Sequence, residues 1–363
     1  GGAGAAILHE LGVLYTGRRP PDGGRLTGDG ESVHAIPSTL PALLGYSGLS
    51  LRGRLKAVRL FATIARGPLP PPDLSFDAWL AQRQSSPEVV SLFRAFLRLS
   101  TYVAASDQLS AAAAVLQMRQ ALSGVIYVDG GWATLVAGLI GRAREYGVTI
   151  NTRSAIRAVH SDAEGVCAVL EGGEKLRAAE VVLAVSPRQA LQLLGSAASA
   201  QLRECVQRSQ PVVAGCLDIG LRRLPRPEVA FALDLVLPRY MSSHSIAAGL
   251  APSGCTLLQM AYYGEGGAIA RTRLEAWLNT LQPGWRDEVI MQRWLPAARI
   301  CDVLPSAKQG GLAGRPTVDA AGLDRVSLCG DWVGPIGLLS DASFASAREA
   351  TMAILQNKLR EGV

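Results

Sequence analysis

Apolar residues recur along the chain with two spacings, one near 3.6 residues and one of two residues. Between residues 130 and 147 the spacing predicts a helix that ends at Gly147, with its apolar positions at Trp132, Leu135, Val136, Leu139, Ile140 and Ala143. After it the pattern predicts short strands at 148–151, 156–160, 166–170 and 181–185. The last of these is an unbroken apolar run, which is typical of a strand buried in a parallel sheet.

The rest of the pattern predicts a helical N-terminal part and a sheet in the second half of the chain. A hairpin is predicted at 25–37, and helices at 49–65, 89–99, 109–122, 189–205, 271–281 and 285–290. Alternating or apolar runs predict an antiparallel sheet from strands at 212–221, 230–237, 246–250 and 256–263. In the basic helix at 49–65 we expect the core-facing side to carry Leu51, Leu55, Val58 and Phe61. An alternative is that this helix lies on an anionic membrane.

The stretch at 323–350 carries the clearest chemistry. A run with a period of two stops at Gly330-Asp331, and a turn rich in glycine and proline leads to a helix start at Ser340-Asp341. An acid at a strand end accepts hydrogen bonds from hydroxyl groups, and the free amides of a helix start favour negative charge or a carbonyl oxygen. The stretch is therefore suited to hold a polar cofactor. The alternative is an ordinary strand-to-helix connection with a surface aspartate.

Composition narrows the class of protein. With 363 residues the chain is long enough for two domains. Its net charge of +6 comes from scattered arginines, so we do not expect nucleic-acid binding. The six cysteines show neither a CxxC pair nor a Cys/His metal spacing, which favours reduced thiols in a cytoplasmic protein without a metal site. No uncharged apolar run reaches the ~18–20 residues of a membrane span, and the first residues predict no secretory signal.

The stretch at 323–350 resembles the C-terminal flavin-binding signature of the flavin-containing amine oxidase and phytoene desaturase superfamily. In that family a strand ends in Gly-Asp, as at Gly330-Asp331, and the acid bonds the ribityl or pyrophosphate part of FAD. The helix that follows points its N-terminus at the pyrimidine end of the isoalloxazine. A second block, 124–159, independently resembles the family's helix that starts at two glycines and the strand that reaches the adenine half of FAD.

This resemblance implies FAD as the cofactor and a set of cofactor-binding residues. They are Gly330, Asp331, Trp332, Leu339, Ser340, Asp341 and Ala342 in the signature, and Ile156 and Ser186 earlier in the chain. We assign no catalytic side chain, because in such enzymes the cofactor carries the chemistry. His244, on a polar loop, and Lys308, near the signature, are better explained as residues without a catalytic role.

The fold expected is α/β: a mostly parallel FAD-binding sheet domain with an inserted α+β substrate domain. The FAD-binding domain is expected at 1–30, 123–190 and 306–363, and the substrate domain at 31–122 and 191–305. The glycines among the first six residues do not fit a dinucleotide fingerprint, because no strand precedes them and no acid ends a second strand about 20 residues later. We therefore expect the FAD-binding domain to be incomplete at its N-terminus. The alternative function is a truncated, non-catalytic remnant that binds no flavin.

The activity implied is oxidation or desaturation of a small organic molecule, with a hydride passing to the flavin. We favour an apolar, isoprenoid-like substrate, because the expected substrate domain is rich in apolar and aromatic residues and poor in acids that could pair with an ammonium group. Amines are the alternative substrate class. Their main candidate partner is Asp234, whose side of the strand depends on which face is core. Peripheral membrane contact is a less favoured alternative.

Overall fold

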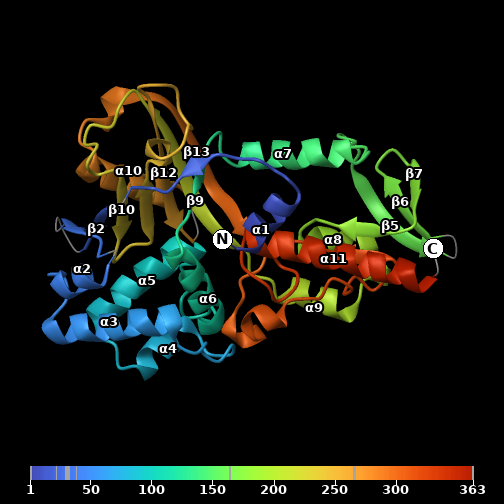
Figure 1. Cartoon of the computed structure of the whole chain (residues 1–363), viewed down its shortest axis with the longest axis horizontal. Coiled ribbons are helices and arrows are strands. Elements are labelled where there is room, and N and C mark those ends of the chain that lie inside the picture. Colours follow the sequence, from blue (N-terminus) through green and yellow to red (C-terminus); the bar gives the residue numbers. More distant parts are fainter. Residues whose placement is uncertain are drawn as a thin grey trace. The chain divides into compact units, whose positions relative to one another are not determined.

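The computed structural model describes residues 2–21, 23–28, 33–37, 39–162, 165–264 and 267–361. The chain divides into two units, each assembled from separate segments (Figure 1). Unit 1 consists of Gly1–Val13, Leu139–Pro211 and Cys301–Val363, and unit 2 of Leu14–Gly138 and Val212–Ile300. These boundaries differ from the expected ones, because residues 14–30 and 123–138 group with unit 2, and residues 191–211 and 301–305 with unit 1.

A seven-stranded sheet forms the centre of unit 2, in the order β13-β9-β12-β11-β10-β2-β3. Its strands are β2 (Arg25–Thr27), β3 (Val33–Ala35), β9 (Val212–Leu221), β10 (Phe231–Asp234), β11 (Arg239–Ser242), β12 (Thr256–Tyr263) and β13 (Val289–Cys301). The pair β10–β2 is parallel, whereas β9–β12, β12–β11, β11–β10 and β2–β3 are antiparallel. The predicted hairpin at 25–37 is thus confirmed, although its turn at 29–32 lies outside the described residues.

Two of the predicted elements in this region are wrong. Residues 246–250 form no strand, since Ile246 ends the 3-10 turn η2 (His244–Ile246) and the residues after it are irregular, and β11 takes the place between β10 and β12. The register explains this choice, because Tyr240 lies opposite Leu233 on one side and Ala261 on the other, so that β11 completes two ladders. Residues 285–290 are helical only in the turn η3 (Trp285–Glu288), after which β13 begins.

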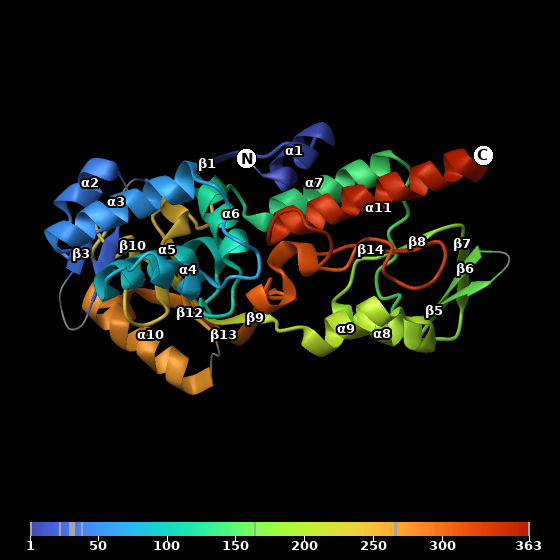
Figure 2. The same ribbon diagram turned by 90° about the horizontal axis from the view of Figure 1, so that it is seen from below.

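The two faces of the sheet have different coverings (Figure 2). Alternate side chains of the strands pack on one face against helix α10 (Gly267–Leu281), in a core that includes Leu217, Met241, Leu258, Met260, Leu274, Trp277 and Leu278. The side chains between them, such as Tyr240 and Tyr263, belong to the opposite face. Helix α5 (Pro87–Thr101) meets the sheet at β10.

Helices fill most of the N-terminal half of unit 2. They are α2 (Leu40–Gly45), α3 (Leu51–Arg66), α4 (Phe76–Gln82), α5 and α6 (Ala111–Leu122). Four of the five begin at a Ser or Thr whose side chain accepts the amide three residues further on, namely Thr39, Ser50, Ser75 and Ser110. This capping satisfies amides that have no partner within the helix. A two-stranded ladder of β1 (Gly17–Arg18) and β4 (Tyr127–Val128) completes the unit.

The buried face of helix α3 differs in part from the one expected, since Val58 and Phe61 are only partly buried and the other two expected residues are exposed. Leu51 and Leu55 are 73% and 51% exposed, whereas the buried residues are Gly53, Ala57, Leu60 and Ile64. Both sets have helical spacing, so the pattern alone could not choose between them. The smaller residues of the buried set let α3 approach α5 and α6 closely. Among the helices that the structure describes, none has a stretch long and apolar enough to cross a membrane.

Unit 1 contains a parallel pair of strands and a separate antiparallel sheet. The antiparallel sheet consists of β5 (Ile156–Asp162), β6 (Gly165–Leu170) and β7 (Lys175–Ala178). The parallel pair consists of β8 (Val181–Leu183) and β14 (Val326–Leu328). The helices are α1 (Ala3–Glu10), α8 (Pro187–Leu194), α9 (Ala200–Arg208) and α11 (Ser340–Glu361). One core joins Val159, Val166, Leu183, Leu202, Leu328, Trp332 and Ala350. The α/β class is confirmed, and among the described strands of unit 1 only β8 and β14 pair in parallel.

The predicted strand at 148–151 is wrong. Helix α7 (Trp132–Glu145) precedes it as predicted, and Gly147 beyond its end has a φ of +79°. The segment that follows forms no ladder, and its Val148 and Ile150 are 52% and 40% exposed. Alternation can suggest a strand, but a strand forms only where a second backbone supplies its hydrogen bonds.

Candidate functional site

Strand β14 leads directly into the first predicted site residue. Gly330 has a φ of +154°, and a Cβ at this position would lie 2.8 Å from Nε1 of Trp332, so only glycine fits without a shift. The N–H of Gly330 donates a 3.0 Å hydrogen bond to Oγ of Ser346 in α11. Because Ser346 is only 1% exposed, this bond fixes the strand end against the helix.

Asp331 follows and is partly buried. Its Oδ2 accepts the backbone N–H of Asp302 at 3.0 Å. Burial raises the pKa of the Asp331 carboxyl above its ordinary value, and although the N–H of Asp302 and the guanidinium of Arg315 oppose this, the net direction is upward. Further hydrogen-bond donors at this carboxylate would therefore stabilise its charged form.

Arg315 is a buried cation that the sequence did not single out. It is 6% exposed, and its Nη1 donates to the carbonyl oxygen of Gly337 at 2.9 Å. Its Nε is buried without a hydrogen-bond partner in the described part of the chain. Burial lowers the pKa of this guanidinium, whereas the nearby Cys301 and Asp331 raise it. An unpartnered buried donor costs about 1–3 kcal/mol, which an acceptor placed there would recover.

Helix α11 begins beside this group after a strained turn. Leu339 has a φ of +55°, in the left-handed region that leucine rarely adopts. Among the residues that the structure describes, no acceptor contacts the amide of Ser340 or that of Ala342. Such first-turn amides attract negative charge or a carbonyl oxygen. Asp341 already has a partner, since its Oδ1 accepts the N–H of Gly4, at the start of α1, at 2.7 Å.

The side chains of three further residues that were predicted to bind the cofactor have structural roles. Trp332 is fully buried, and its Nε1 donates to the carbonyl oxygen of Val185 at 3.0 Å. Ser186 caps α8, because its Oγ accepts the N–H of Gln189 at 3.4 Å. Ile156 begins β5 and packs partly buried against the core of unit 1. A role of these three residues in cofactor binding stays a prediction.

The remaining six predicted residues lie at the end of β14 and the start of α11. The structure connects these two places through Ser346, which holds Gly330, and Arg315, which holds Gly337. Together they offer a carboxylate, an unpartnered buried guanidinium N–H and free helix amides. These groups fit FAD, which carries hydroxyls, phosphates and ring carbonyl oxygens. Sequence reasoning missed both residues, because Arg315 lies outside the stretch 323–350 and nothing in the sequence of that stretch marks Ser346 as the partner of Gly330.

One face of the sheet in unit 2 carries an aromatic group, which we call the tyrosine cluster. Oη of Tyr240 lies 2.8 Å from Nε2 of His244, and the ring centroid of Tyr127 lies 4.1 Å from that of His244. Tyr263 lies 6.4 Å from Tyr240 and 6.2 Å from Tyr102, between ring centroids. Burial lowers the pKa of His244 to about 4, so this imidazole is neutral near pH 7.

Asp234, the expected partner for an ammonium group, lies on the opposite face and is fully engaged. It is 1% exposed and forms an ion pair with Arg239, whose guanidinium stacks over Trp277 of α10. Its carboxylate also accepts a hydrogen bond from the hydroxyl of Thr27 at 3.0 Å, and hydrogen bonds from the amides of Val236 and Leu237 in the following turn at 2.8 and 2.7 Å. It cannot bind a substrate without breaking these bonds.

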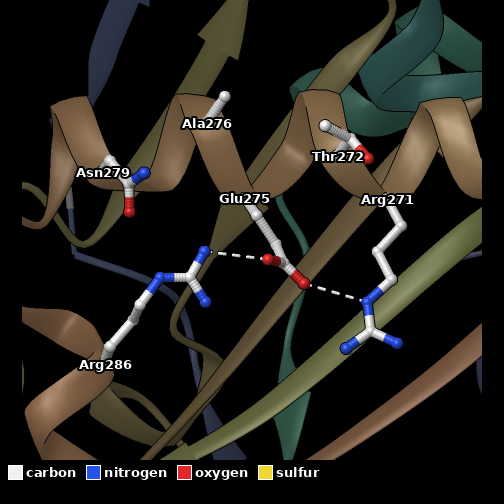
Figure 3. A pocket seen from close by; sticks show the side chains of 6 residues that line it. All are labelled: Arg271, Thr272, Glu275, Ala276, Asn279 and Arg286. Carbon is white, nitrogen blue, oxygen red and sulfur yellow. Dashed lines mark hydrogen bonds and ion pairs between the residues drawn. The ribbon is translucent and has the colours of Figure 1, made fainter.

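A hollow of about 390 Å³ on α10 has a lining of six residues: Arg271, Thr272, Glu275, Ala276, Asn279 and Arg286 (Figure 3). The Glu275 carboxylate accepts one hydrogen bond from Nε of Arg271, at 2.9 Å, and another from Nη2 of Arg286, at 2.8 Å. Burial would raise the pKa of Glu275, but these bonds bring it below its ordinary value. Both arginines thus neutralise an acid of the protein itself. No group of metal-binding side chains lies here or elsewhere in the described ranges.

Comparisons with known proteins identify the family. The family model for flavin containing amine oxidoreductase matches residues 6–355, so the chain belongs to this family. The predicted family, the class of FAD-dependent oxidoreductase and FAD as its cofactor are thereby confirmed. No curated protein matches the chain.

Solved structures share the fold at low sequence identity. An oxidoreductase from Methanosarcina mazei is 16% identical with a TM-score of 0.74, and the match covers 97% of this chain and 85% of that one. Putrescine oxidase bound to putrescine is 14% identical, with a TM-score of 0.72 and coverage of 97% and 85%. Cyclohexylamine oxidase from Brevibacterium oxydans is 14% identical, with a TM-score of 0.67 and coverage of 98% and 85%. At these identities the likeness concerns the fold alone.

Proposed function

We propose that this protein oxidises or desaturates an apolar organic substrate, with FAD held between the end of β14 and the start of α11. The observation that carries the cofactor part is the convergence of Asp331, Arg315 and the free amides of α11 in one place. When bound, FAD supplies a ring that accepts a hydride from the substrate. The protein's own contribution is to bind, to orient and to exclude water.

Each group of the site has a distinct part in this binding. Asp331 accepts hydrogen bonds from hydroxyl groups, which favours its charged form against the effect of its burial. Nε of Arg315 donates to a phosphate or carbonyl oxygen, and so do the amides of Ser340 and Ala342. Ser346 keeps Gly330 in the backbone conformation that brings Asp331 to this position.

The substrate class is inferred from whether unit 2 offers an unpaired carboxylate that could bind an ammonium group. Asp234 is buried in its own ion pair, and Asp218 on the tyrosine-cluster face is paired with Arg293, with 2.6 Å between Oδ2 and Nη2. An ammonium group would thus find no unpaired acid on these strands, among the residues described. The tyrosine cluster suits a planar or apolar molecule. It also supports the second candidate, an amine, because tyrosine faces attract cations and the structural neighbours include amine oxidases.

The cofactor part of the proposal is tested by titrating the protein with FAD and following flavin fluorescence. Asp331→Ala should weaken FAD binding by about 1.5–3 kcal/mol, because it removes charge-assisted hydrogen bonds. Asp324→Ala is the matched control, since Asp324 is an exposed acid just before β14. Equal affinities of D331A and D324A would show that Asp331 does not bind the cofactor.

The substrate part has its own experiment, which uses protein saturated with FAD. The protein is mixed anaerobically with a polyene precursor, an aromatic monoamine and a polyamine, and the flavin absorption band is followed. Bleaching by the polyene is the expected result. Bleaching by an amine alone would reverse the choice of substrate class, but would leave the cofactor assignment intact.

A further inference from the structure

Helix α5 borders a second hollow in unit 2, of about 460 Å³, which we call the α5 pocket. One wall is polar and consists of Ser91, Arg94, Arg98 and Ser106. The other wall is mainly apolar, and comes from Ala104 and from the turn after β10, with Leu235, Val236 and Pro238. No acid lines the pocket, which sets it apart from the hollow on α10.

Arg98 is the central feature of this pocket. It is 7% exposed, and its Nη2 donates a 2.6 Å hydrogen bond to the carbonyl oxygen of Asp234. Its Nε and Nη1 make no hydrogen bond to any residue that the structure describes. Burial and the nearby Arg94 lower the pKa of Arg98, whereas Tyr263 and Asp234 raise it, and the arginine remains charged at neutral pH. A buried cation that contacts only a carbonyl oxygen is poorly compensated.

The carboxylate of Asp234 is near enough to raise the pKa of Arg98, but it forms no ion pair or hydrogen bond with that guanidinium. The side chain of Asp234 is occupied by Arg239, by Thr27 and by two turn amides. Its carboxylate therefore already balances a different guanidinium. Arg98 therefore lines the pocket without an ion-pair partner among the described residues.

Arg94 adds a second guanidinium one helical turn earlier. Its Nε and Nη2 donate to the two oxygens of Asp77 at 2.9 and 2.6 Å, which leaves Nη1 for another acceptor. The hydroxyls of Ser91 and Ser106 also have no hydrogen-bond partner within the described ranges. The polar wall thus presents several unused donors around one uncompensated charge.

In the hollow on α10, by comparison, two arginines share one carboxylate of the protein (Figure 3). There Glu275 lies between Arg271 and Arg286 and accepts from both. In the α5 pocket Arg94 is paired with Asp77, but no carboxylate among the described residues lies between Arg94 and Arg98 or forms an ion pair with Arg98. An external oxyanion would take the position that Glu275 fills in the other hollow.

We propose that the α5 pocket binds the carboxylate or phosphate group of a small molecule that has a short apolar tail. The anion accepts hydrogen bonds from Arg98 and from the outer nitrogen of Arg94, and the hydroxyls of Ser91 and Ser106 complete its coordination. The tail lies along Leu235 and Pro238. The residues that line the α5 pocket belong to unit 2, whereas those proposed to bind FAD belong to unit 1.

Isothermal titration calorimetry on the full chain tests the proposal, with hexanoate and hexyl phosphate as probes at constant ionic strength. Saturable binding of one molecule per chain is expected for at least one of the two. Arg98→Gln should weaken it about tenfold or more, because it removes a charge-assisted pair. Arg286→Gln, the matched control in the hollow on α10, should bind like the unchanged protein. Comparing the two probes shows which oxyanion the pocket prefers.

The outcomes that overturn the proposal are equally defined. Absence of saturable binding for both probes would refute it, and so would equal affinities of R98Q and the unchanged protein. If R98Q does not fold, Arg94→Gln and Ser91→Ala decide, because both alter partly exposed side chains. Each should weaken binding about threefold or more, and unchanged affinity in both would reject the site.

Discussion

Replacing Asp234 by asparagine tests how much one buried ion pair stabilises unit 2. Asparagine has nearly the same shape but no charge, so Arg239, whose side chain is 15% exposed, would remain a cation without a carboxylate. The carboxylate also accepts from Thr27 and from two turn amides, and asparagine has a single acceptor oxygen to replace both. Removal of one partner from a buried pair costs about 3–5 kcal/mol. We expect D234N to lower the free energy of unfolding of unit 2 by this amount.

Urea unfolding followed by tryptophan fluorescence measures this loss. Trp277 reports on the region, because its Nε1 donates to Oγ1 of Thr27 at 3.2 Å and its ring lies 4.9 Å from the Arg239 guanidinium carbon. The control is Asp218→Asn, since Asp218 pairs with Arg293, whose side chain is 63% exposed. Exposed pairs contribute at most about 1 kcal/mol, so D218N should unfold almost like the unchanged protein.

Two results would refute this reasoning. The first is a loss below about 1 kcal/mol for D234N, or a loss equal to that of D218N. The second concerns the double variant D234N/R239M, which removes the cation together with its partner. It should recover part of the stability lost in D234N, because no unpaired charge remains. A double variant less stable than D234N would mean that Arg239 contributes by packing on Trp277 rather than by its charge.

Two further predictions concern His244 and Ser346. His244 has its pKa lowered by burial to about 4 from 6.5, so between these values the unfolded state binds a proton that the folded state does not. The free energy of unfolding therefore falls as the pH drops from about 6.5 to 4, by up to about 3 kcal/mol. His244→Phe should remove this part of the pH dependence, which urea titrations at several pH values measure. An unchanged pH profile of the variant would contradict the assignment. Ser346→Ala leaves the N–H of Gly330 without its acceptor, which should cost about 1–3 kcal/mol in unfolding experiments and also weaken FAD binding. Ser343→Ala, on the same helix, serves as its control, and equal effects of the two would show that Ser346 does not hold the site.

Elements with a strong local pattern could be predicted from the sequence. Helix α7 and strands β9 and β14 were expected within a few residues of their bounds, because apolar residues recur at helical spacing in the first and alternate in the other two. In α7 this spacing does not report burial, since Trp132 and Val136 are 64% and 52% exposed and only Leu135 of the helix is buried. Elements that depend on a distant partner were not. The segment 148–151 alternates but has no strand to pair with, and β11 took the position expected for 246–250 because its register suits both neighbours.

The candidate site divides in the same way. The Gly330-Asp331 turn and the helix start at Ser340 could be recognised, because they are contiguous and carry their own conformational signals. Arg315 and Ser346 could not, since their partners Gly337 and Gly330 lie well away in sequence. The same limit applied to Asp234, whose side of the strand follows from the packing of α10 rather than from its neighbours in the chain.

The construction of unit 1 from three chain segments determines when its parts can come together during synthesis. Strand β8 leaves the ribosome long before β14, its hydrogen-bonding partner, and residues 212–300 of unit 2 are made in between. Unit 2 has all of its segments before β14 exists, so it can begin to fold on the ribosome while β8 still lacks its hydrogen-bonding partner. The place proposed for FAD, made by β14 and α11, is thus synthesised after every segment of unit 2.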